Sequence, residues 1–134
     1  MKLHRVKPRK GFLSRLLRER SGAVAVEFAL TVPILLVALL GIIEFGRVLW
    51  AQNALHYAVE EAARCATIDL TTCGNTSETQ TYASTASGYT FATSVFTVTV
   101  TTCGNQVSAS YPFQFLTSLV SYNLTLTARA CYPT

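Results

Sequence analysis

The feature that most constrains the fold is an uncharged apolar run of sixteen residues, Phe28 to Ile43. A helix over residues 23–43, which number 21, is about 31 Å long at about 1.5 Å per residue, close to the hydrocarbon thickness of a bilayer. We therefore predict one transmembrane span over residues 23–43. Pro33 lies inside it, and we expect a bend there rather than an end, with Thr31 supplying a local hydrogen bond.

Glu27 is the anomaly of this span. An acidic residue at the centre of a membrane helix costs about 2.5–3.5 kcal/mol, and less near the interface. One interpretation is that Glu27 meets a cation of another chain, so that each ion offsets the desolvation cost of the other. The other is that its carboxylate reaches the cytoplasmic interface and stays charged without a partner.

The charges are distributed unevenly along the chain. Residues 1–22 hold eight Lys or Arg and one Glu, whereas the remaining 112 residues hold three bases and six acids. Because basic residues flanking a span stay in the cytoplasm, the N-terminus is predicted inside and the C-terminal part outside. A basic arm can also bind nucleic acid, but no folded module or aromatic stacking platform accompanies this one, so we predict no nucleic-acid partner.

A glycine, four small or apolar residues and then Glu27-Phe28 open the apolar run. This arrangement resembles the prepilin processing site of the Flp (tight-adherence, Tad) pilus system. The later Gly-Ile-Ile-Glu-Phe-Gly-Arg at residues 41–47, with the helix after it, resembles the TadE-like pseudopilins. The resemblance covers about residues 21–66.

This resemblance implies a processing event and a set of partners. A membrane prepilin peptidase would cut the bond between Gly22 and Ala23, and Glu27 with Phe28 would then face the new N-terminus of a neighbouring subunit. The implied partners are the membrane, the peptidase, other pilin or pseudopilin subunits and the Tad assembly machinery.

The helix is predicted to continue beyond the membrane to about residue 66. Glu44 and Arg47 stand three apart and can pair at the periplasmic end of the span, either as a membrane-edge anchor or as an inter-subunit contact. Small apolar residues then recur at alternating spacings of three and four, which is typical of a helix that packs closely along one face. They are Val48, Ala51, Leu55, Ala58, Ala62 and Ala66.

Residues 67–134 contain 25 Ser or Thr and three charged residues. Ser77 and Gln80 resemble a capping box for a short helix that ends at Gly88. Apolar and polar residues then alternate in three segments, near 96–101, 107–113 and 122–130, with a turn at 103–105. We predict an α+β, pilin-like fold: a long N-terminal helix, transmembrane span plus periplasmic stalk, packed on a small three- to four-stranded, mostly antiparallel sheet.

The domain organisation follows from these segments. We predict a basic cytoplasmic leader peptide at residues 1–22, the long helix at 23–66 and a periplasmic head at 67–134. The span and its basic flank predict a single-pass protein with a cytoplasmic N-terminus. The resemblance implies that the membrane is the bacterial inner membrane, with incorporation into an extracellular pilus as a further stage.

The four cysteines all follow the span, where disulfides persist. Cys65 and Cys73 flank the predicted end of the helix, and Cys103 and Cys131 end two strands that run in the same direction. We prefer the pairs Cys65–Cys73 and Cys103–Cys131, which would staple the head. A Cys73–Cys103 bridge remains an alternative, because Thr-Thr-Cys-Gly-Asn occurs at both 71–75 and 101–105.

No catalytic or metal-binding motif stands out. His4 lies in the leader and His56 on the amphipathic helix, with no nucleophile motif or phosphate loop nearby, and the cysteines lack the close spacing of a zinc site. We predict no enzyme activity, no cofactor, no metal and no small-molecule substrate. Because the major Flp pilins are shorter and almost entirely helical, the resemblance implies a minor, TadE-like subunit. Two alternatives stay open: an uncleaved membrane scaffold of the same machine, and a membrane-tethered periplasmic binding module.

Overall fold

The computed structural model describes residues 20–116 and 122–133. The chain divides into two compact units, Met1–Ile42 and Ile43–Thr134, and each is described by itself. The predicted leader, apart from its last residues, lies outside the described residues. The elements in chain order are the helices α2 (Arg20–Ile68) and α3 (Thr76–Ala86), the 3-10 helix η1 (Thr93–Val95), and the strands β1 (Phe96–Thr101), β2 (Gly104–Phe113) and β3 (Leu124–Tyr132).

Helix α2 confirms the long N-terminal helix and extends slightly beyond the predicted range at both ends. Among the described residues it is the one helix that is long and apolar enough to cross a membrane. It continues through Pro33, as predicted. The Thr31 hydroxyl donates to the backbone carbonyls of Glu27 (3.0 Å) and Phe28 (3.3 Å), and not to that of Ala29, the carbonyl that loses its donor because proline has no N–H.

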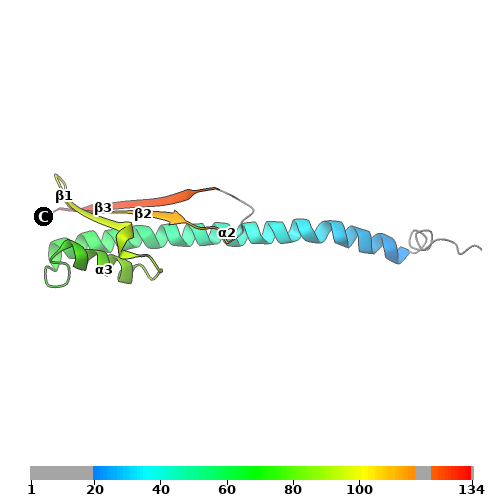
Figure 1. The fold of residues 1–134 in the computed structure, drawn as a ribbon, viewed down its shortest axis with the longest axis horizontal. Helices are drawn as coiled ribbons and strands as arrows, with labels where there is room; N and C mark the ends of the chain where they lie inside the picture. Colours follow the sequence, from blue (N-terminus) through cyan, green and yellow to red (C-terminus); the bar gives the residue numbers. More distant parts are fainter. Residues whose placement is uncertain (1–19, 117–121, 134) are drawn as a thin grey trace, which may run out of the picture. The chain divides into compact units, whose positions relative to one another are not determined.

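The sheet of the Ile43–Thr134 unit is three-stranded and entirely antiparallel, in the order β1-β2-β3 (Figure 1). Phe96 pairs with Ala109 across β1 and β2, and Ala109 pairs with Ala128 across β2 and β3. The predicted turn at 103–105 is shifted, because strand β1 ends at Thr101 and strand β2 already begins at Gly104. Gly104 has φ 120°, a conformation that favours glycine, so it can close this tight hairpin.

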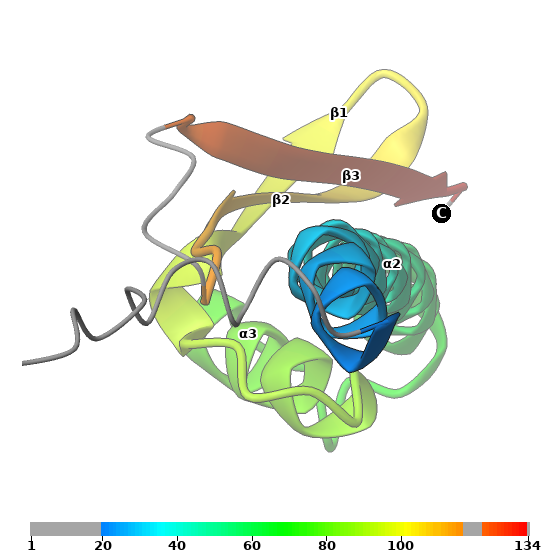
Figure 2. The ribbon, with the colours of Figure 1, turned by 90° about the vertical axis from the view of Figure 1, so that its right-hand side faces the viewer.

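The core lies between one face of the sheet and the two helices. Figure 2 shows the sheet as one layer, with the 43–68 part of α2 and helix α3 on the same side of it. The predicted alternation holds for most of the strand residues, since Phe96, Val107 and Leu126 face this core and the Thr-rich face lies outside. It fails at the end of β1, where Val100 is 80% exposed. The buried apolar residues of the core come from both layers: Ala51, Ala54, Leu55, Ala58, Val59, Ala62, Ala63, Ala83, Phe91, Phe96, Val107, Ala109, Phe113, Leu126 and Ala128.

The small residues of α2 therefore pack on the chain's own sheet. Ala51, Ala58 and Ala62 are completely buried in the core, and alanine at these positions lets the helix axis approach the strands closely. The opposite face, with Asn53, His56, Glu60 and Arg64, is exposed as predicted. The sequence left open whether these small residues pack on the head or on neighbouring helices. In the structure they pack on the head.

Helix α3 was predicted, but its cap was assigned to the wrong residue. The N-cap is Asn75, whose side-chain oxygen accepts from the N–H of Glu78 (2.9 Å), and Glu78 accepts in return from the N–H of Gly74 (3.1 Å). The reciprocal pair thus begins two residues before Ser77. The Gln80 amide instead donates to the carbonyl of Phe96 (2.7 Å), the first residue of the edge strand β1. Because this carbonyl is occupied, it is not free to pair with another strand.

Two disulfides connect the ends of these elements. Cys65 is joined to Cys73 and Cys103 to Cys131, with Cα–Cα distances of 5.7 Å and 6.4 Å. These are the two preferred pairs, so the alternative Cys73–Cys103 bridge is wrong. The first bridge fixes the chain just after α2 leaves the sheet, and the second ties the β1–β2 turn to the end of β3.

Candidate functional site

The predicted processing site lies near the first described turn of α2. The bond between Gly22 and Ala23 is inside the helix, which begins at Arg20. A protease that needs an extended substrate would therefore have to unwind this turn. Glycine makes that easier, because it loses the most backbone entropy in a helix.

Glu27 lies about one turn beyond that bond. It is exposed, and its helix neighbours Val24, Val26 and Phe28 are exposed as well. Within the described part of this unit, no side chain forms an ion pair or a hydrogen bond with the Glu27 carboxylate. Ala23 and Glu27 are four residues apart, so they lie on one face of the helix, about 6 Å apart along its axis.

Glu44 is the buried charged residue among the described residues of the other unit. It is buried, with 8% of its surface exposed, although it follows directly on the apolar run. One carboxylate oxygen accepts from the Arg47 guanidinium at 2.7 Å and the other from the backbone N–H of Leu116 at 2.8 Å. Both oxygens of this buried charge are thereby satisfied, as a buried carboxylate requires.

The Arg47 side chain connects this carboxylate to the end of the sheet. Its guanidinium carbon lies 5.2 Å from the centre of the Phe113 ring, within range of a cation–π contact, and Phe113 in turn makes an edge contact with Phe115. The pairing of Glu44 with Arg47 could be anticipated from their spacing. The contact with Leu116 could not, because no local pattern connects residues 72 positions apart.

The C-terminal end of α2 is closed by side chains. The amide nitrogen of Asn105 donates to the carbonyl of Ala66 (3.0 Å) and to the hydroxyl of Thr67 (3.1 Å). The hydroxyls of Thr71 and Thr72 donate to the exposed carboxylate of Asp69 and lower its pKa from 3.8 to about 2. These contacts stabilise the turn at the Cys65–Cys73 bridge.

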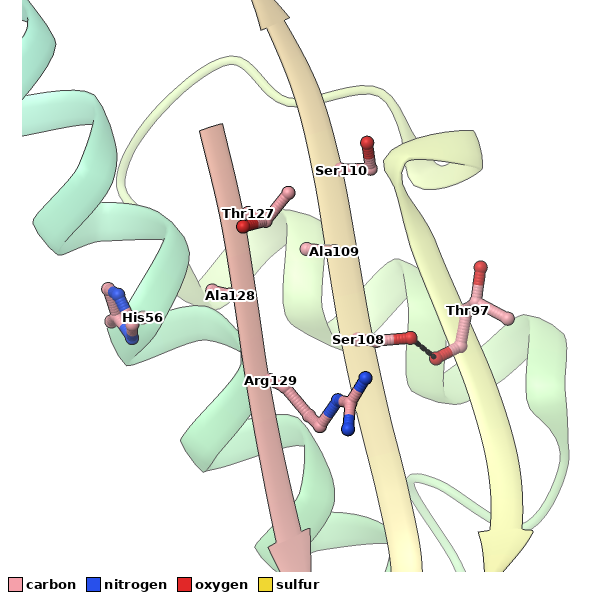
Figure 3. Close-up of a pocket in the computed structure, with 8 residues that line it drawn as sticks. All are labelled: His56, Thr97, Ser108, Ala109, Ser110, Thr127, Ala128 and Arg129. Carbon is pink, nitrogen blue, oxygen red and sulfur yellow. Dashed lines mark hydrogen bonds between the residues drawn. The ribbon is translucent and has the colours of Figure 1, made fainter. Parts of the chain in front are cut away.

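A polar hollow of about 360 Å³ lies at the sheet, lined by His56, Thr97, Ser108, Ala109, Ser110, Thr127, Ala128 and Arg129. Figure 3 shows that His56 approaches β3 from α2, whereas Ser108 donates to the carbonyl of Thr97 (3.5 Å) on the neighbouring strand. The ring nitrogen of His56 contacts the Gln52 amide (2.8 Å), which also donates to Thr127. No hydrogen bond joins His56 to Ser108 or Ser110 among these residues, so the hollow lacks a paired base and nucleophile.

The four cysteines cannot act as metal ligands, because each is part of a disulfide. Within residues 20–116 and 122–133, the structure places no group of three His, Cys, Asp or Glu side chains where they could share an ion.

Residues 22–64 match the family model described as TadE-like protein. No curated protein and no solved structure matches the chain. The matched segment begins at the predicted cleavage bond and includes Glu27, Glu44 and Arg47, whereas the sheet lies outside it.

Proposed function

Because residues 22–64 of this chain are TadE-like, we propose that it is a minor pilin or pseudopilin, processed by a prepilin peptidase, that contributes to the assembly of a Flp/Tad-type pilus. The TadE-like family is generally associated with Tad pilus assembly and is typically non-enzymatic. The long apolar helix is consistent with a single membrane anchor, and the disulfides suggest an extracytoplasmic head.

The observation that carries this proposal is the position of Glu27. It is the one ionisable residue between Ala23 and Ile43, and it lies exposed on an apolar surface one turn beyond a Gly-Ala bond. Cleavage of that bond creates an ammonium group on Ala23. In a stack of subunits, the ammonium of one chain can pair with the Glu27 carboxylate of the next, and each ion offsets the desolvation cost of the other.

The head supports a structural role. Its sheet takes up the small-residue face of α2, so the exposed face of the helix is what remains for contacts with other molecules. Leu49, Trp50 and Tyr57 lie on this exposed face. A subunit built in this way can join others through its helix while the head keeps its own core.

The uncleaved scaffold is the first alternative, and it would have the same head. The mass of the N-terminal peptide distinguishes the two functions, measured on protein purified from strains with and without the peptidase. We expect a chain that begins at Ala23 in the first strain and one that retains Met1 in the second. Retention of Met1 in both strains would establish the scaffold and refute processing.

Two matched variants sharpen this experiment. Gly22→Val places a branched side chain next to the scissile bond and should block cleavage, because the bond can no longer approach the protease closely. Gly41→Val is the control, since a side chain added at Gly41 meets nothing within 4 Å and the residue lies far from the bond. Normal cleavage of Gly22→Val would count against the assigned site.

Glu27→Ala tests the role of the carboxylate after cleavage. We expect normal processing but reduced incorporation into pili, because the new ammonium loses its partner. Glu60→Ala removes an exposed carboxylate from the same helix outside the span and serves as the control. Normal pilus output from Glu27→Ala would contradict the pairing.

The binding module is the second alternative, and the hollow of Figure 3 is the site it would need. Six of its eight lining residues have polar side chains, and Thr97, Ser110, Thr127 and Arg129 are all exposed. Ligand pockets are mostly apolar with a few convergent polar groups. The lining of the hollow therefore supports a binding module less well than the position of Glu27 supports a pilin.

A further inference from the structure

We propose that the hollow of Figure 3 binds a hexuronate, a sugar that carries one carboxylate and several hydroxyl groups. The Arg129 guanidinium holds the carboxylate, and the short polar side chains around it hold the sugar hydroxyls. This adds a binding activity to the proposed function and does not depend on the role of Glu27. All the residues that carry the proposal belong to the Ile43–Thr134 unit.

Arg129 is an isolated positive charge on the outer face of the sheet. It is the one charged residue that follows Glu78 in the sequence. Its side chain is exposed, and among the described residues its guanidinium forms no ion pair. A guanidinium presents its N–H donors in a planar fork that matches the two oxygens of a carboxylate. Arg129 is therefore available to hold an anion.

A charge on an edge strand can also serve to prevent pairing with another strand. The edge of β3 is already occupied beside this point, because the Gln52 amide donates to the carbonyl of Thr127 at 2.9 Å. Protection of an edge needs only a charge, which lysine supplies as well as arginine does. Arginine adds the planar fork, so a lysine variant separates the two roles.

The register of the sheet brings four hydroxyl groups beside the guanidinium. Thr97 pairs with Ser108, and Ser108 pairs with Arg129, so these three residues form one row across the strands. Ser110 and Thr127 pair in the next row on the same face. With strands about 4.8 Å apart and about 3.3 Å per residue along a strand, the two rows cover about 10 Å by 7 Å. In Figure 3 the Arg129 side chain extends from β3 across β2, toward Ser108.

Small side chains leave the space above these rows open. Ala109 and Ala128 line the hollow between the rows and are buried toward the core. The volume of the hollow, about 360 Å³, lies at the lower end of the range of about 300–1,000 Å³ that ligand pockets occupy. We therefore expect the site to hold one sugar ring rather than a larger ligand.

The charges of the lining indicate a ligand with a single negative charge. None of the eight described residues that line the hollow is acidic, and Glu60, one turn after His56 on α2, is not among them. The Gln52 amide nitrogen can only donate, so the His56 ring nitrogen that it contacts at 2.8 Å accepts, and the imidazole is neutral there. Arg129 thus supplies one positive charge, which matches a carboxylate, whereas a phosphate dianion calls for a second cation.

The remaining lining residues indicate that the rest of the ligand is polar. A hydroxyl group is both a donor and an acceptor, so the Ser and Thr side chains of the hollow can pair with sugar hydroxyls, which are both as well. None of the lining residues is large and apolar, so the hollow is unsuited to an apolar ligand. A hexuronate meets both requirements, because it combines one carboxylate with several hydroxyls.

The test is nuclear magnetic resonance of the full chain in detergent micelles with the disulfides intact and the threonine methyl groups labelled with carbon-13. Thr97 and Thr127 report on the hollow. Thr125 is the matched reporter outside it, because it is exposed on the same face of β3 but does not line the hollow. The probes are D-glucuronate, D-glucose, acetate and inorganic phosphate, compared at equal ionic strength.

We expect D-glucuronate to shift the methyl signals of Thr97 and Thr127 and to leave that of Thr125 unchanged. Glucose lacks the carboxylate and acetate lacks the sugar hydroxyls, so each should bind at least about tenfold more weakly. No shift with D-glucuronate would overturn the site. Acetate that binds as tightly as D-glucuronate would overturn the recognition of a sugar, and phosphate that binds more tightly would overturn the match to a single negative charge.

Arginine variants test the guanidinium. Arg129→Gln should abolish the shifts, and Arg129→Lys should weaken binding by about tenfold to a hundredfold, because it keeps the charge but loses the fork. Arg64→Gln is the control, since Arg64 is exposed on α2 outside the lining, and it should bind like the parent. Equal binding by Arg129→Lys and the parent would show that Arg129 supplies only a charge at the edge of β3.

Ser110→Ala tests the hydroxyls separately from the charge. It should weaken the binding of D-glucuronate and leave that of acetate unchanged, a difference that a loss of folding would not produce. Equal binding of D-glucuronate by Ser110→Ala and the parent would overturn the contact with the sugar hydroxyls.

A hexuronate can be a free sugar or a residue of an acidic polysaccharide, and both present the same groups. D-galacturonate and its linear trimer distinguish the two sources. Tighter binding of the trimer assigns the polysaccharide, and tighter binding of the monomer assigns the free sugar. Binding of neither would overturn the site. The N-terminal mass that tests processing is a separate measurement, so failure of this site leaves the proposed function intact.

Discussion

Removal of the Glu44 carboxylate is predicted to destabilise the Ile43–Thr134 unit. The residue is buried, and each of its oxygens has a different partner, Arg47 at 2.7 Å and the N–H of Leu116 at 2.8 Å. Glu44→Ala leaves both partners without an acceptor. The segment after β2 then loses its hydrogen bond to α2, and the contact between Arg47 and the Phe113 ring remains.

The magnitude follows from the two contacts. A hydrogen bond to a charged acceptor contributes about 1.5–3 kcal/mol. The ion pair contributes about 0.5–1 kcal/mol, because the Arg47 side chain is 31% exposed and solvent screens it. We therefore expect Glu44→Ala to lower the free energy of unfolding by about 2–4 kcal/mol. Glu44→Gln should lose about 1–2 kcal/mol, since its amide oxygen can still accept from Leu116.

The assay is equilibrium unfolding of the full chain in detergent micelles with the disulfides intact. Near-ultraviolet circular dichroism reports on the aromatic residues packed around Phe113. A double-mutant cycle with Arg47→Ala isolates the ion pair, with an expected coupling energy of about 1 kcal/mol.

Two results would refute this reasoning. A loss of less than about 0.5 kcal/mol for Glu44→Ala, the range of ordinary surface substitutions, would show that the two contacts do not stabilise the unit. A loss from Glu44→Gln equal to that from Glu44→Ala would show that the bond to Leu116 contributes nothing, because that bond is what the amide retains.

Three further predictions concern the Ile43–Thr134 unit. Leu55→Ala, at a completely buried position, should cost about 2–5 kcal/mol in equilibrium unfolding because it opens a cavity. Replacing both Cys103 and Cys131 by serine should cost about 3–4 kcal/mol by the chain-entropy relation, since the bridge closes a sequence separation of 28 residues. Asp69, whose pKa is lowered to about 2, should titrate near that value by nuclear magnetic resonance, and Thr71→Val should move its pKa toward 3.8. Because the folded pKa is the lower one, the stabilisation from Asp69 is complete above pH 3.8 and is lost as the pH falls toward 2.

These predictions have controls within the same chain. Tyr57→Ala removes a large side chain that is 53% exposed on the same helix as Leu55, and it should change the stability by less than about 0.5 kcal/mol. A cost for Leu55→Ala no larger than that of Tyr57→Ala would contradict the packing of α2 on the sheet. An unchanged Asp69 pKa in Thr71→Val would show that the hydroxyl does not hold it low.

The elements could be predicted because their signals are local. The uncharged run and the three-and-four spacing of small residues identified α2, and the alternation around Phe96, Val107 and Leu126 identified the strands. The two disulfides followed from the ends of these elements once the strand directions were assigned. Each prediction depended on a pattern within about one element, where periodicity determines which side chains share a face.

The caps and turns were harder to predict, because neighbouring residues compete for the same role. Ser77 and Asn75 are both good caps, and only the geometry of the turn after Cys73 selects Asn75. The asparagines of the repeated Thr-Thr-Cys-Gly-Asn bind two different helix ends. Asn75 accepts from the start of α3, and Asn105 donates to the end of α2.

Long-range polar contacts gave no signal at all. Glu44 binds Leu116, and Gln52 and Gln80 donate to carbonyls on the outer strands, yet each partner is a backbone group that any residue type would present. A sequence pattern cannot identify such partners, because they depend on where the sheet lies along the helix. The role of Glu27 stays a prediction, since its proposed partner belongs to another subunit.

The most direct test of the central claim joins the Glu27 carboxylate to the amino group it is proposed to meet. A membrane-permeable carbodiimide forms an amide bond between a carboxylate and an amine in contact, and mass spectrometry of assembled pili identifies the linked peptides. We predict a cross-link between Glu27 and the N-terminal amine of a neighbouring subunit that is absent without the prepilin peptidase. A processed chain that begins at Ala23, but whose Glu27 reacts with no amine in assembled pili, would contradict the account.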